Sequence, residues 1–178
     1  MSMIKVIKRN GKKELVMLDK ILDRITQQTY GLDQKWIVPF EVAQKVIEGI
    51  MPDIQTSVLD QLAMETAASL TTKHPDYSTL AARLAITALH KETKKSFSET
   101  VTDLYKYVDP KTRKHSPIVS EQFHKLVLKH ADELDSAIVH SRDHNFDYFG
   151  FKTLEKSYLL KVNGKVAERP QYMYMRTA

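Results

Sequence analysis

A chain of 178 residues with 42% apolar side chains is long enough to bury the core of one ordinary domain or of two small ones. Its 27 Lys and Arg against 22 Asp and Glu leave a formal charge of +5, which favours anionic partners, and the lack of cysteine excludes disulfides and thiolate sites within the sequence. No stretch approaches the roughly 20 apolar residues of a membrane span, so we expect a cytoplasmic protein with no membrane partner.

A β-hairpin is predicted at the start of the chain, over residues 4–18. Asn10-Gly11 lies between aliphatic and β-branched residues, and Asn-Gly is the dipeptide that best fits a type I′ turn. Lys8 and Arg9 precede this turn and Glu14 follows it. Lysines also protect the exposed edge of a hairpin, so an edge element without a ligand is the alternative interpretation of these charges.

Four helices are predicted to follow the hairpin and to form a small bundle, over residues 19–31, 39–49, 56–73 and 76–95. Each shows apolar residues at spacings of three and four, and Asp19 and Thr56 are the expected N-caps of the first and third helices. A hairpin alone is marginal in water. We therefore expect it to lie on the helices, as one domain of residues 1–95.

Residues 96–178 are predicted to form a second, mostly helical region. Helical patterns cover residues 97–108, 120–130 and 133–139, and the run Tyr158–Val162 leads into a second Asn-Gly turn that predicts another hairpin. Pro170 opens a last helix with barely two turns, which suggests a fragment of a longer protein. The histidines of this region show no spacing typical of metal ligands, so no metal site is expected.

Polar residues of the first region could together hold a polyphosphate. A hydroxyl at a helix N-terminus beside several cations is a favourable place for phosphate groups. Each residue also has a simpler explanation as a helix cap, a partner of the helix dipole or a surface charge, and no Gly-rich phosphate loop is present. The candidates are Lys8, Arg9, Lys20, Thr56, Asp60 and Lys91.

Several motifs resemble a known family. In the first region they are Val6-Ile-Lys-Arg-Asn-Gly, Leu59-Asp-Gln-Leu-Ala, His74-Pro-Asp-Tyr and Leu89-His-Lys-Glu-Thr. In the second they are Asp147-Tyr-Phe-Gly-Phe-Lys-Thr-Leu-Glu-Lys-Ser-Tyr-Leu-Leu and Gly164-Lys-Val-Ala-Glu-Arg-Pro-Gln. Together they resemble the N-terminal region of the eukaryotic-type large subunit of class I ribonucleotide reductase, which contains an ATP-cone. The second group separates this chain from cone-bearing transcriptional repressors, which resemble only the first region.

The resemblance implies a mostly α fold, with a β-hairpin lid on a four-helix bundle (the ATP-cone) followed by further helices and a short second hairpin. It also implies binding of ATP, which activates, or dATP, which inhibits, together with Mg²⁺. By position, Lys8, Arg9, Thr56 and Lys91 would hold the phosphates, Val6, Glu14, Lys20 and Ile21 would surround the adenosine, and Asp60 would distinguish ATP from dATP.

Partners implied by the resemblance are other large subunits, whose assembly depends on the effector, and the small radical-generating subunit of the reductase. Because the family's reducing cysteines are absent, we expect nucleotide binding without reductase activity. A nucleic-acid-binding helical module and an assembly surface without a ligand are the alternatives. The first lacks a helix-turn-helix or a stacking-aromatic signature, so we expect no nucleic-acid partner.

Overall fold

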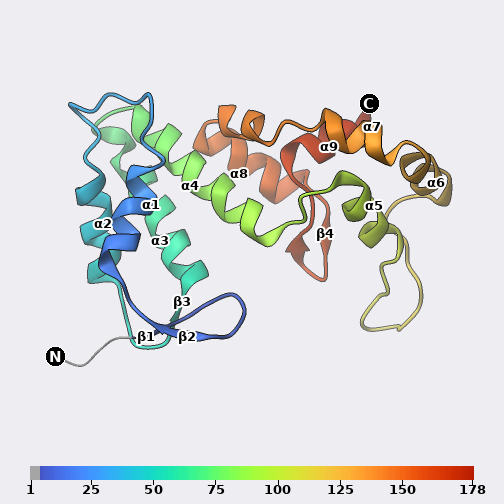
Figure 1. The fold of residues 1–178 in the computed structure, drawn as a ribbon, viewed down its shortest axis with the longest axis horizontal. Helices are drawn as coiled ribbons and strands as arrows, with labels where there is room; N and C mark the ends of the chain where they lie inside the picture. Colours follow the sequence, from blue (N-terminus) through green and yellow to red (C-terminus); the bar gives the residue numbers. More distant parts are fainter. Residues whose placement is uncertain (1–4) are drawn as a thin grey trace. The chain divides into compact units, whose positions relative to one another are not determined.

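The computed structural model describes residues 5–178, which divide into two compact units (Figure 1). Of the described residues, unit 1 comprises 5–88 and Phe146–Phe151, and unit 2 comprises Leu89–Asn145 and Lys152–Ala178. Most described residues are helical, with a small sheet in unit 1 and a two-stranded hairpin in unit 2. The predicted fold class is therefore confirmed, although Ile4 of the predicted hairpin lies outside the described residues.

The N-terminal hairpin is part of a three-stranded sheet. Strand β1 (Lys5–Ile7) pairs antiparallel with β2 (Lys13–Leu15) and parallel with β3 (Ile54–Gln55). In these ladders Val6 lies opposite Glu14 on one side and Ile54 on the other. Because β3 leads directly into helix α3 (Thr56–Ser69), the pairing fixes the start of α3 beside the hairpin. A strand of two residues is too short to show an alternating pattern, and the sequence did not predict it.

The turn of this hairpin is not the predicted type I′. Gly11 has a φ of +80°, but Asn10 is not among the non-glycine residues with positive φ. The Lys8 amide donates to the Lys12 carbonyl (2.9 Å), and the Gly11 amide donates to the Lys8 carbonyl (2.8 Å). This is a three-residue loop, in which a type I turn is followed by a left-handed glycine. The Asn10 side chain accepts a bond from the Lys12 amide (3.0 Å) instead of taking positive φ.

The second Asn-Gly turn does have the predicted geometry. Asn163 and Gly164 have φ of 52° and 77°, and they join β4 (Lys161–Val162) to β5 (Lys165–Val166). The strand is shorter than the predicted Tyr158–Val162. The amides of Tyr158 and Leu159 both donate to the Leu154 carbonyl, so they close a helix rather than extend a strand.

Helices α1 (Leu18–Thr26), α2 (Pro39–Glu48), α3 and α4 (Asp76–Glu92) follow the predicted order. In unit 1, α1 packs on α2 and α2 packs on α3. Both predicted N-caps are wrong by one or two positions, because Met17 precedes α1 and Gln55 precedes α3. Helix α1 ends at Thr26 rather than near Gly31, and α3 passes into a 3₁₀ turn, η1 (Leu70–Thr72).

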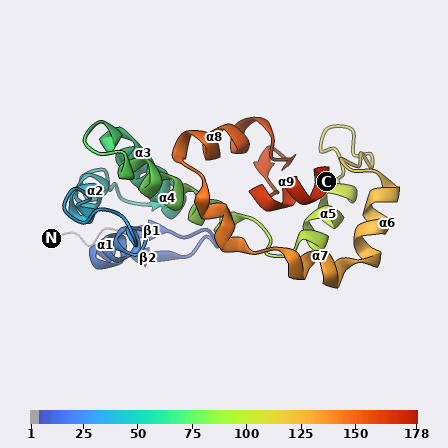
Figure 2. The same ribbon diagram turned by 90° about the horizontal axis from the view of Figure 1, so that it is seen from above.

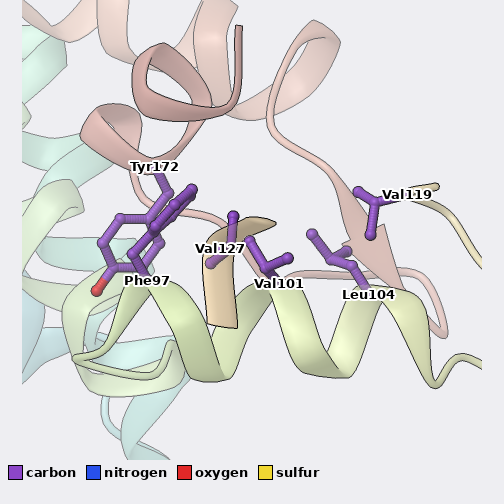
Figure 3. Packing of buried hydrophobic residues seen from close by; sticks show 6 residues of the cluster. All are labelled: Phe97, Val101, Leu104, Val119, Val127 and Tyr172. Carbon is purple, nitrogen blue, oxygen red and sulfur yellow. The ribbon is translucent and has the colours of Figure 1, made fainter. Parts of the chain in front are cut away.

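Unit 2 is built on α5 (Phe97–Tyr105), which packs against α6 (Glu121–Lys129) and α7 (Ala131–Ala137), as Figure 2 shows. Figure 3 shows the core that α5 forms with residues from other segments. Its members are Phe97, Val101, Leu104, Val119, Val127 and Tyr172. The last of these comes from α9 (Pro170–Thr177), which lies against the 3₁₀ segment η2 (His140–Asn145). Helix α8 (Tyr148–Ser157) was not predicted, because its aromatic residues show no helical period.

Buried charges of unit 2 are fully hydrogen-bonded. The Arg169 guanidinium donates to the carbonyls of His90 (3.0 Å) and Thr93 (3.1 Å), to the Thr93 hydroxyl (2.9 Å) and to His140 Nδ1 (3.1 Å). Glu168 accepts bonds from Arg176 (2.7 and 3.1 Å) and from the Leu160 amide (2.9 Å). Through these contacts Glu168 and Arg169 each join segments of unit 2 that are far apart in the sequence or lie in different elements.

Replacing Leu104 with Ala should lower the free energy of unfolding of unit 2 by about 2–5 kcal/mol, because a fully buried Leu leaves a cavity. Chemical denaturation followed by circular dichroism measures this loss. Leu126→Ala is the matched control, because Leu126 is 57% exposed and its loss should cost little. Equal losses in the two variants would contradict the assignment of the core.

Asp135 is expected to contribute to the free energy of unfolding in a pH-dependent way. Its carboxylate accepts bonds from the Ser98 amide (2.9 Å), the Ser98 hydroxyl (2.7 Å) and the Ser96 hydroxyl (2.8 Å). Burial raises its pKa, but these bonds outweigh burial and leave the pKa below its ordinary value. A carboxylate with a lowered folded pKa stabilises the fold above the unfolded pKa and loses that effect as the pH falls through the folded pKa.

Asp135→Asn should therefore destabilise the chain by roughly 1 kcal/mol at pH 7, and the difference from the unchanged protein should shrink toward pH 3. Urea denaturation at both pH values measures it. Asp132→Asn, at an exposed position of α7, should show a small and constant difference. A difference for Asp135→Asn that stayed the same at both pH values would refute the assigned role.

Candidate nucleotide site

Asp60 is the buried charge at the centre of the candidate site. It is 3% exposed, on α3, and its carboxylate meets two guanidinium groups. Arg9 Nη2 lies 2.7 Å from one oxygen, and Arg24 forms an ion pair with the other oxygen. Arg9 belongs to the hairpin turn and Arg24 to α1, so three elements of unit 1 meet at this carboxylate. A buried carboxylate is tolerated only with such partners.

A second set of charges lies along the hairpin. Lys8 Nζ is 2.6 Å from Glu14 and Lys12 Nζ is 3.8 Å from it. The hydrogen bond from Lys8 lowers the pKa of Glu14, burial opposes it, and the charges of Lys8, Lys12 and Lys20 lower the pKa further. Lys8 therefore contacts Glu14 directly, whereas Lys20 acts on it only through its charge. Lys13 forms a separate ion pair with Asp53 (2.8 Å).

Thr56 is the first residue of α3 and is partly buried. In the described part of the chain, no side chain caps this N-terminus, so its amide groups keep their capacity to bind an anion. Val6 is buried in β1 and Ile21 is partly buried in α1. Lys91 lies in the last turn of α4 and belongs to unit 2, so its place beside the hairpin stays a prediction.

Arg24 is the residue that the sequence analysis missed. It lies four positions after Lys20, and this spacing places both on one helix face, which was the available signal. Burial, and then the charge of Arg9, lower the pKa of Arg24 to about 10, so it stays cationic at neutral pH. Within residues 5–178, its buried Nε and Nη2 have no hydrogen-bond partner.

The donor set fits an anionic ligand. Two guanidinium groups share one carboxylate, two buried donors of Arg24 are unmet, and the start of α3 offers backbone amides. Phosphate oxygens accept bonds from all of these groups. In the described residues, no group of His, Cys, Asp and Glu could hold a metal ion by itself. Among those residues no helix is both long and apolar enough to cross a membrane.

Comparison with known proteins identifies the family. Residues 4–92 match the ATP cone domain, and residues 144–178 match the all-alpha domain of ribonucleotide reductase. The chain is 55% identical over 173 residues to the ribonucleoside-diphosphate reductase large chain of Schizosaccharomyces pombe, covering 97% of this chain and 21% of that protein. The large subunits of Vaccinia virus (57% identical) and Danio rerio (55%) match over the same 97% of this chain and 22% of their own length.

The chain thus spans about a fifth of the length of these curated relatives. Apart from Thr93, the matched regions include both sets of motifs that carried the resemblance, on either side of residue 95. The chain belongs to the ATP cone family, in the form that precedes the all-alpha domain in ribonucleotide reductase large subunits.

Proposed function

We propose that this chain is an allosteric module that binds ATP or dATP and controls the overall reduction of ribonucleotides to deoxyribonucleotides by its parent reductase. The observation that carries the proposal is the buried Asp60 carboxylate, shared by Arg9 and Arg24 beside the uncapped start of α3. We assign the effector site to residues 1–95 and the start of the catalytic region to residues 96–178.

The phosphates would be held by Lys8, Arg9, Thr56 and Lys91. The Thr56 hydroxyl and the amides of α3 supply neutral donors at a helix N-terminus, and the cations supply charge. Mg²⁺ would accompany the nucleotide, bound mainly by phosphate oxygens and water, since such sites need few protein ligands.

The adenosine would lie on the other side of the hairpin, against Val6, Glu14, Lys20 and Ile21. Val6 and Glu14 are directly opposite in the β1–β2 ladder, and the charge of Lys20 acts on Glu14. These residues come from the hairpin and from α1, and the hairpin turn and α1 also supply Arg9 and Arg24 to Asp60.

Regulation would follow from linkage. The effector would change how large subunits assemble with one another and with the small radical-generating subunit. It can do so only by the difference in its binding free energy between two assembly states, typically about 1–3 kcal/mol. The 178 residues contain no cysteine, and we propose that they bind nucleotide without reducing it.

Calorimetric titration of the chain with ATP and with dATP, in the presence of Mg²⁺, tests this function. We expect both nucleotides to bind, and Asp60→Asn to reduce the ratio of their dissociation constants more than it weakens ATP binding. The reason is that Asp60 lies at the meeting point of the hairpin, α1 and α3. No heat at millimolar nucleotide would exclude the proposed function.

Asp53→Asn is the matched control, because Asp53 is 51% exposed and pairs only with Lys13 among the described ion pairs. It should leave both dissociation constants unchanged. Unfolding is measured in parallel, since loss of the Asp60 charge leaves two guanidinium groups without a counter-ion and should cost about 3–5 kcal/mol. Titrations are therefore run at a temperature where Asp60→Asn is folded by circular dichroism.

A further inference from the structure

The two arginines that share Asp60 differ in their setting. Arg9 is in a tight turn at the tip of the hairpin, and its side chain is 29% exposed, close to the 26% of Arg24. Arg24 is in the last turn of α1, which is packed on α2. If nucleotide phosphates draw Arg9 toward themselves, as the proposed function requires, Asp60 keeps one counter-ion, and that counter-ion is Arg24.

Stability of the fold does not explain Arg24. The Arg24 side chain is partly buried, and its Nε and Nη2 atoms are hidden from solvent without a hydrogen-bond partner, which costs free energy. A residue without these donors would fill the same place at lower cost. The lowered pKa of Arg24 records the same penalty. The ion pair with Asp60 is its one hydrogen-bonding contact among the described residues, so its role lies in what it does to that carboxylate.

We propose that Arg24 is a positioning residue: it holds the Asp60 carboxylate in place and ionised while the effector engages Arg9, so that discrimination between ATP and dATP depends on it. This inference rests on the proposed function. The charged groups that contact Asp60 in the described structure are Arg9 from the hairpin and Arg24 from α1. With Arg9 engaged and Arg24 absent, the buried carboxylate would have no cation, and burial would favour its protonated form.

Titrations of the whole chain with Mg-ATP and Mg-dATP test the proposal in Arg24→Gln and Arg24→Lys. In Arg24→Gln the ratio of the two dissociation constants should move toward 1, to the same extent as in Asp60→Asn. Arg24→Lys keeps the charge and should retain most of the ratio. The double variant Arg24→Gln/Asp60→Asn should discriminate between ATP and dATP no less than either single variant, because both changes disrupt the same Arg24–Asp60 interaction.

Lys13→Met is the control, since it removes a cation from the same sheet that pairs with Asp53 rather than Asp60. It should leave the ratio unchanged. A ratio in Arg24→Gln equal to that of the unchanged protein would overturn the inference while leaving the proposed function intact. Failure of the unchanged protein to bind either nucleotide would instead remove the proposed function.

If Arg24→Gln does not fold, the inference can be tested in the protein with Arg24 unchanged. Carbon NMR of labelled aspartate carboxylates, with Asp60 assigned by its loss in Asp60→Asn, reports whether Asp60 is ionised. We expect it to be ionised at pH 6 both without nucleotide and at saturation with Mg-ATP. Protonation of Asp60 on saturation would overturn the inference.

Discussion

The site in unit 1 depends on the sharing of one buried carboxylate by two guanidinium groups. Asp60 is 3% exposed, and its ion pairs reach the hairpin through Arg9 and α1 through Arg24. Each of these elements is short, and the hairpin strands have three residues each. Elements of this size do not fix their own position in water. The charge cluster therefore joins the hairpin and α1 to α3, in addition to the packing of α1 on α2 and the β1–β3 pairing.

The β1–β3 pairing supplies the other constraint. It places Val6 opposite Ile54 and so carries the chain from the sheet directly into α3 at Thr56. The result is a helix N-terminus without a side-chain cap in the described residues, next to the cations of the hairpin. An uncapped helix start is usually a cost, and here it becomes a place where an anion can satisfy the amide groups.

The sequence predicted those features that rest on periodicity and on charge. The four helices of the first region were found because their apolar residues recur at three and four, and Arg9 and Asp60 were both among the candidate polar residues. It missed β3 and the type of the first turn, because both depend on tertiary contacts. Asn10 could adopt positive φ, as Asn163 does, but instead bonds the Lys12 amide. Local propensity cannot decide between these two outcomes.

The sequence does not distinguish Arg24 from ordinary helix charges. Comparison with two other arginines, Arg169 and Arg83, shows why its setting matters. Arg169 is 2% exposed and donates to four acceptors, so its burial stabilises unit 2. Arg83 has an unmet Nε, but it donates to two carbonyls and lies 3.8 Å from the centre of the Tyr30 ring. Arg24 has neither compensation in the described residues. Since native structures rarely leave buried donors unmet, an arginine kept in this state is better explained by a ligand-dependent role than by folding alone.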